Sequence, residues 1–121
     1  MIAGEGLETI LSVGTALPAA SLAACLTANH LAAFEPPAHV RRLFVALDND
    51  EAGARALGLL RERLSPRGLQ IAPLTPRAND FNDDLRAHGL PALRDALARQ
   101  LDHATFERLS AASREKRPTF A

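Results

Sequence analysis

The sequence contains few of the residues that build cross-links or zinc sites. Its single cysteine, Cys25, excludes an intrachain disulfide, and its four scattered histidines show no zinc-ligand spacing. Basic and acidic side chains number 14 each, so the formal net charge is zero and the electrostatic signature of a free-standing nucleic-acid binder is missing. Any nucleic acid would therefore have to be held locally, or by other parts of a longer protein.

Long apolar runs are also missing. No stretch approaches the roughly 20 residues that a membrane helix needs, and the start Met1–Glu5 lacks a basic region followed by a hydrophobic core. The sequence therefore predicts neither a membrane segment nor a secretory signal, and a reducing cytoplasmic location fits its cysteine usage. With 121 residues, 47% of them hydrophobic, the chain is long enough for one domain with its own core.

The strongest apolar run, Leu43–Leu47, is continuous, which is typical of a strand buried on both faces of a parallel sheet. Asp48 and Asp50 follow it, and because strand side chains alternate in direction, the two carboxylates are expected to point the same way. Two carboxylates about 4 Å apart repel by about 4 kcal/mol at an effective dielectric constant of roughly 20, so such a pair favours a bound cation. The pattern predicts a hard divalent cation, Mg²⁺ or Mn²⁺.

Segments with strand and helix patterns alternate along the rest of the chain. The spacing of apolar residues predicts helices near residues 7–14, 28–34, 53–64 and 90–101, strands near 22–26 and 69–74, and a polar turn over 75–84. Because proline cannot donate to a strand ladder, Pro73 either places the strand near 69–74 at a sheet edge or confines its pairing to the start of the strand.

This alternation implies parallel βαβ units and an α/β fold with a mostly parallel sheet of about four strands flanked by helices. In such sheets ligands bind beyond the carboxyl ends of strands, where Glu5, Asp48 and Asp50 are expected to collect. The domain is predicted to cover residues 1–101, with a polar C-terminal tail over 102–121. Because only four residues precede Glu5, we expect a truncated first strand and a chain that is a fragment of a longer protein.

At its acidic motifs the chain resembles the Toprim domain of bacterial primases, topoisomerases and some nucleases. The hallmarks of that family are a glutamate after the first strand and a later D-x-D-x-x-G motif, which match Glu5–Thr9 and Asp48–Gly53. The closest likeness is to the Toprim modules of plasmid- and phage-type DNA primases and primase-helicases. Those modules share an A-L-S-x-x-N-L-like segment and a D-[FW]-N-D segment, here Ala24–Leu31 and Asp80–Asp83. The match spans Ile2–Leu101 and implies the Rossmann-like Toprim fold.

The resemblance implies a role in DNA replication. The implied enzyme is a primase-like nucleotidyltransferase that makes RNA primers. In it, Asp48 and Asp50 would be ligands of Mg²⁺ or Mn²⁺, and Glu5 would be a further ligand or an acid-base group. The implied partners are a DNA template, nucleotides, and zinc-binding or helicase domains of the same full-length protein. Neutral charge and a truncated first strand leave open whether this piece is active alone.

Five further residues are candidates for the site. Asp80 and Asp83 are candidate metal ligands, since they offer a second pair of carboxylates, but they also suit a turn or a helix N-cap. The candidate substrate contacts are Asn29, Arg41 and Arg42, of which the arginines flank a strand and also suit solvent-exposed positions.

Simpler explanations also exist for two of the three principal acids. Glu5 suits a helix N-terminus as a favourable negative charge, and Asp50 suits an N-cap. Asp48 has no such explanation, which makes it the strongest candidate ligand.

Two other functions remain open. A Toprim nuclease would use the same acids to place two metals and activate water, and a noncatalytic nucleic-acid-binding or protein-binding module would keep only the fold. The covalent DNA-cleavage step of topoisomerases is excluded within this chain, because the sequence contains no tyrosine.

Overall fold

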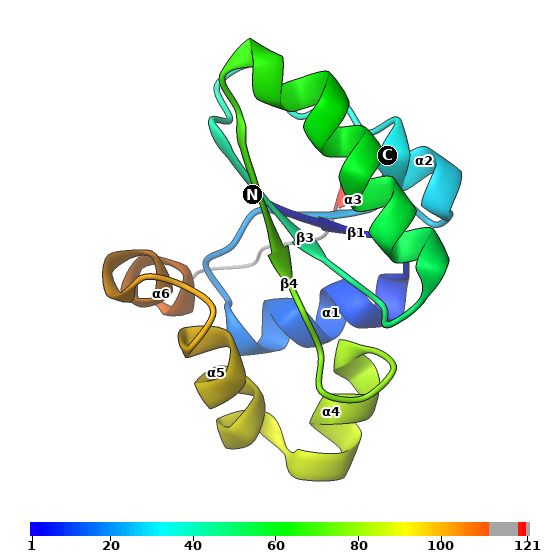
Figure 1. Cartoon of the computed structure of the whole chain (residues 1–121). Helices are drawn as coiled ribbons and strands as arrows, with labels where there is room; N and C mark the ends of the chain where they lie inside the picture. Colours follow the sequence, from blue (N-terminus) through cyan, green and yellow to red (C-terminus); the bar gives the residue numbers. More distant parts are fainter. Residues whose placement is uncertain (112–118, 121) are drawn as a thin grey trace.

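A computed structural model describes residues 1–111 and 119–120, in which a sheet lies between two layers of helices (Figure 1). The strands are β1 (Ile2–Gly4), β2 (Leu22–Ala24), β3 (Arg42–Ala46), β4 (Gln70–Leu74) and β5 (Thr119–Phe120). The helices are α1 (Leu7–Ala16), α2 (Ala28–Ala32), α3 (Glu51–Leu64), α4 (Phe81–His88), α5 (Leu90–Ala98) and α6 (His103–Ser110), with a 3-10 turn η1 (Ser65–Arg67).

The sheet has the strand order β4-β3-β1-β2-β5, and every neighbouring pair is parallel. This confirms the predicted α/β fold, and the two-residue β5 adds a strand to the four that were expected. Gly4 pairs with both Ala24 and Ala46, so β1, β2 and β3 end level with one another. The chain passes from β1 to β2 on one side and returns to β3 on the other, which makes the β1–β3 end a topological switch point.

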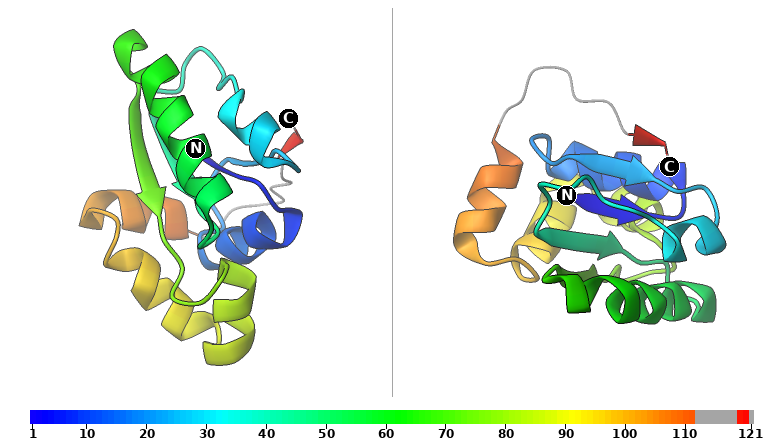
Figure 2. Two further views of the ribbon diagram at one scale, coloured as in Figure 1. Left: turned by 45° about the vertical axis from the view of Figure 1, so that its right-hand side comes forward. Right: turned by 90° about the horizontal axis from the view of Figure 1, so that it is seen from above.

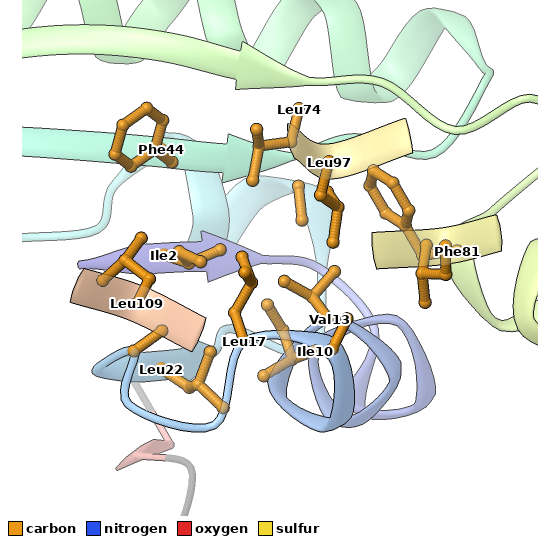
Figure 3. Close-up of a cluster of buried hydrophobic side chains, with 14 of the residues drawn as sticks. Ile2, Ile10, Val13, Leu17, Leu22, Phe44, Leu74, Phe81, Leu97 and Leu109 are labelled. Atoms are coloured by element: carbon orange, nitrogen blue, oxygen red, sulfur yellow. The ribbon is translucent and has the colours of Figure 1, made fainter. Parts of the chain in front are cut away.

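Both faces of the sheet are buried, which explains why the β3 sequence is apolar throughout. Phe44 and Ala46 pack in a cluster with α1, α4, α5 and α6, whereas Leu43 and Val45 pack in a second cluster with α2 and α3. Figure 2 shows the two layers from further directions, with α2 and α3 on the same side of the sheet. Figure 3 shows the first cluster, which includes Ile2, Ile10, Val13, Leu17, Leu22, Phe44, Leu74, Phe81, Leu97 and Leu109.

β4 is an edge strand, the first of the two alternatives that Pro73 allowed. Pro73 lies opposite Val45 of β3. It does not interrupt the pairing of β4 with β3, since the register continues to Leu74.

The predicted polar turn over residues 75–84 was wrong in its second half, because α4 begins there. Asp80 is the N-cap, and its side chain accepts a hydrogen bond of 2.7 Å from the backbone N–H of Asp83. Phe81 is fully buried, so a single aromatic side chain anchors a helix that is otherwise mostly polar. With so few apolar residues, the segment lacked the periodicity that identifies a helix.

A helix also forms within the segment that was predicted to be a polar tail. Asp102 caps α6 by accepting a hydrogen bond of 3.1 Å from the Thr105 N–H, and Leu109 is buried in the first cluster. The part of the tail prediction that covers residues 112–118 and 121 lies outside the described residues. None of the helices in the described ranges has the length and apolar character needed to cross a membrane.

Candidate metal centre

Three carboxylates from two separate parts of the chain meet at the switch point. Glu5 follows β1, Asp48 lies just beyond β3, and Asp50 precedes α3. One oxygen of each side chain lies within 4.8 Å of the oxygens of the other two. Because β1 and β3 are paired and end level, residues that are 43 positions apart in the sequence become neighbours.

The turn between β3 and α3 holds Asp50 in a double role. Its Oδ1 accepts a hydrogen bond of 2.6 Å from the Gly53 N–H, so it is an N-cap, as one reading of the sequence proposed. Its backbone N–H donates to the Asp48 carbonyl over 2.9 Å, which closes the turn and keeps the two acids together. Asp50 therefore caps α3 and belongs to the acidic group at the same time.

Gly53 allows this turn to close tightly. A Cβ at this position would lie 3.0 Å from the Asp48 carbonyl oxygen and 3.1 Å from Asp50 Oδ1. We expect Gly53→Ala to weaken Mn²⁺ binding about tenfold, or about 1.4 kcal/mol, because the added methyl group displaces both acids. Isothermal titration calorimetry measures this change.

Gly58 of α3 provides the matched control, since a Cβ there meets nothing within 4 Å. Gly58→Ala should stabilise the protein by about 0.5–1 kcal/mol through helix propensity and leave Mn²⁺ affinity unchanged. Equal Mn²⁺ affinity in Gly53→Ala and Gly58→Ala would show that the turn tolerates the methyl group.

Thr9 supports the acidic group from α1. Its buried hydroxyl donates a hydrogen bond of 3.1 Å to Asp48 Oδ1, which fixes the orientation of that carboxylate. The sequence interpretation gave Thr9 no role, although Thr9 lies in the first turn of α1, four residues after Glu5.

Burial and the repulsion between neighbouring carboxylates make a negative charge on Glu5 and on Asp48 unfavourable. Burial, followed by the Asp48 and Asp50 carboxylates, raises the pKa of Glu5. Burial is also the main cause of the raised pKa of Asp48, where the Thr9 hydrogen bond acts in the opposite direction and the charges of Asp50 and Asp80 add to the increase. A cation would relieve this repulsion, and three carboxylates are the oxygen donors that Mg²⁺ and Mn²⁺ prefer.

Asp80 and Asp83 lie outside the three-carboxylate group. Asp80 caps α4, and its charge contributes to the raised pKa of Asp48, so it is a neighbour of the group. The third aspartate of the segment, Asp84, is buried and accepts hydrogen bonds from the backbone N–H groups of Arg77 and Ala78. These bonds give Asp84 a structural role in holding the loop before α4.

Asn49, in the turn between β3 and α3, is hydrogen-bonded to the loop before α4. Its side-chain amide donates to the carbonyl oxygens of Pro76 and Ala78, and its backbone N–H donates to the Asn79 carbonyl over 2.8 Å. These contacts bring the loop that carries Asp80 against the turn that carries Asp48. The sequence gave no signal for this role, because both the acceptors and the donor are loop residues.

The two arginines among the candidate substrate contacts lie away from the acidic group. Arg41 and Arg42 lie at the amino end of β3, and Asp48 follows its carboxyl end, so the structure does not bring the arginines to the acidic group. Arg42 donates a hydrogen bond of 2.9 Å to Thr105 Oγ1. Asn29 is exposed on α2 and lines an open groove against α3.

A strained loop borders Glu5. Leu26 has a left-handed backbone, with φ of +74°, and its side chain is 54% exposed. Its N–H donates to the Glu5 carbonyl over 2.6 Å, next to the bond of 2.8 Å from the Cys25 N–H to the Gly4 carbonyl. Such a backbone costs a leucine about 1–2 kcal/mol.

Cys25 itself has no part in the site. It is fully buried, as the sequence interpretation proposed, and burial raises the pKa of its thiol to about 11. It therefore behaves as a small apolar residue.

Comparison with known proteins supports the reading of the acidic motifs. The sequence model of the family described as the Toprim domain matches residues 1–90, which include the whole acidic group and α4. No curated protein and no solved structure matches the chain.

Proposed function

Because the chain belongs to the Toprim domain family, we propose that it is the catalytic module of a primase-like nucleotidyltransferase that makes RNA primers on a DNA template. Toprim domains bind divalent metals, act on nucleic acids and occur in primases, nucleases and topoisomerases. The observation that supports a catalytic module most is the meeting of Glu5, Asp48 and Asp50 at the β1–β3 switch point. A domain that kept only the fold would have no need of three acids in mutual repulsion.

The three acids divide between two roles in this proposal. Asp48 and Asp50 would hold Mg²⁺ or Mn²⁺, and Thr9 would keep the Asp48 carboxylate turned toward the site. The metal, when bound, supplies charge neutralisation for the phosphoryl group under attack. Glu5 has a raised pKa, which suits it either to complete the metal site or to accept the proton of a primer 3′ hydroxyl.

The proposal also includes partners. A DNA template and nucleotides would bind at the carboxyl edge of the sheet, and zinc-binding or helicase domains of a longer protein would supply the contacts that a neutral chain lacks. The boundary proposed for the Toprim domain, residue 101, leaves α6 outside it.

A metal-dependent nuclease is the second candidate, and Asp80 is the observation in its favour. The charge of Asp80 contributes to the raised pKa of Asp48, so a fourth carboxylate is a neighbour of the group, and a second metal site of the kind that nucleases use would draw on it.

One pair of assays separates the two candidates. The full chain is incubated with Mg²⁺ or Mn²⁺ and either a single-stranded DNA template with labelled ribonucleotides or end-labelled DNA. We expect labelled primers in the first assay, intact DNA in the second, and loss of primers in Glu5→Gln. Asp95→Asn, which changes an exposed carboxylate of α5, serves as the control and should retain activity. Metal binding without either product would favour the noncatalytic module.

A further inference from the structure

Leu26 is an exposed apolar side chain held in a position that does not favour it. Its left-handed backbone is imposed from both sides: its N–H is bonded to the Glu5 carbonyl, and the next residue, Thr27, caps α2. A glycine would adopt the same backbone without strain. Packing does not compensate a leucine here, because more than half of the side chain, 54%, is exposed.

This strained position borders the acidic group directly. The loop follows β2, which is paired with β1 and ends level with it, so Leu26 lies at the carboxyl edge of the sheet beside Glu5. Leu7, two residues beyond Glu5 in the sequence, is a second leucine with 37% of its side chain exposed. Strained backbone at such an edge is a feature of ligand-contacting loops.

The charges around the site indicate what kind of contact is needed. None of the ion pairs within residues 1–111 includes Glu5, Asp48 or Asp50. Arg41 and Arg42 lie at the amino end of β3, opposite the end that Asp48 follows. Within the described residues, therefore, no basic side chain forms an ion pair with this group. A nucleic acid held here through a metal would need uncharged contacts with its sugars and bases as well.

We propose that Leu26 is a substrate contact: it packs against a base of a single-stranded nucleic acid whose phosphate lies at the acidic group. This inference rests on the proposed function and adds a contact that the acids cannot make. A leucine presents an apolar surface without hydrogen-bonding groups, so the contact tolerates any base. The strained backbone directs the Leu26 side chain away from the core. A glycine at this position would offer the base no side chain to pack against.

Two substitutions at this position test the contact. Leu26→Ala keeps the backbone strain and removes most of the side chain, whereas Leu26→Gly removes both. The probe is a fluorescein-labelled single-stranded oligodeoxythymidylate with Mg²⁺, followed by fluorescence anisotropy on the full chain. We expect both variants to bind the probe about three- to tenfold more weakly, with Mn²⁺ affinity unchanged and the melting temperature of Leu26→Gly equal to or above that of the unsubstituted chain.

Leu11→Ala is the matched control, because Leu11 is a leucine of α1 that is 45% exposed. It should bind the probe as the unsubstituted chain does. Probe affinity that is equal in Leu26→Ala and the unsubstituted chain overturns the contact and leaves the proposed function standing. Failure of the unsubstituted chain to bind the probe in any metal-dependent way overturns both.

Discussion

Asp48→Asn is expected to lower the affinity for Mn²⁺ by about tenfold or more, at least about 1.4 kcal/mol, while raising the melting temperature of the metal-free protein. The two effects share one cause. Asp48 lies with Glu5 and Asp50 in a group whose oxygens are within 4.8 Å of one another, so it both attracts a cation and repels its neighbours. Asparagine has the same shape and still accepts the Thr9 hydrogen bond, so the substitution changes charge with little change in packing.

The direction of the stability change follows from the pKa of Asp48, which folding raises above its usual 3.8. A carboxyl group of this kind binds protons more tightly in the folded chain, so it stabilises the fold at low pH. That stabilisation is lost as the pH rises through the raised pKa, and at neutral pH the charge destabilises the metal-free fold. The gain from Asp48→Asn should therefore appear at pH 7 in EDTA and disappear at pH 3.

Asp95→Asn again provides the comparison, because it removes one exposed carboxylate from α5. Titration calorimetry and thermal denaturation of the two variants, with and without metal, measure both effects. A destabilised Asp48→Asn protein that binds Mn²⁺ normally would mean that the carboxylate serves the fold and not a metal.

Phe81→Ala is expected to cost about 3–5 kcal/mol of unfolding free energy, a large part of the about 5–15 kcal/mol that holds a domain together. Phe81 is the largest fully buried side chain among the residues whose burial is described, and it attaches α4 to the cluster formed with α1 and α5 (Figure 3). Alanine would leave a cavity beneath a helix whose only other packed apolar side chain is Leu85. Urea denaturation followed by circular dichroism measures the loss.

Phe106→Ala, which shortens a partly buried phenylalanine of α6, should cost clearly less. The difference between the two variants tests whether α4 is an integral part of the fold. If Phe81→Ala lost less than about 1 kcal/mol, α4 would be loosely attached in solution, and Asp80 would then have no fixed place beside Asp48.

The sequence was sufficient for the central part of this fold, for reasons that particular residues show. Leu43–Leu47 is apolar without alternation because both sheet faces are covered, and that pattern predicted a parallel strand ending at Asp48. Glu5 was placed beside Asp48 from the rule that carboxyl ends of parallel strands share an edge. Both inferences depend on local pattern and on topology, which the order of elements largely determines.

The remaining features depend on contacts between distant residues. The Thr9 hydroxyl is bonded to Asp48, 39 positions away in the sequence, and the Asn49 amide is bonded to Ala78, 29 positions away. No spacing pattern in the sequence predicts either bond. The left-handed backbone of Leu26 was equally hidden, since leucine is an uncommon residue for it. α4 was missed because Asp84, a charged residue, occupies a buried position through bonds to backbone N–H groups.

The proline of β4 affects how this chain meets other chains. An exposed sheet edge invites strands from neighbouring molecules, since its free N–H and C=O groups form a ready ladder. Pro73 lacks an N–H, so the outer side of β4 offers a broken row of donors to an incoming strand. The same residue that leaves the β3 pairing intact thus protects the molecule against edge-to-edge aggregation.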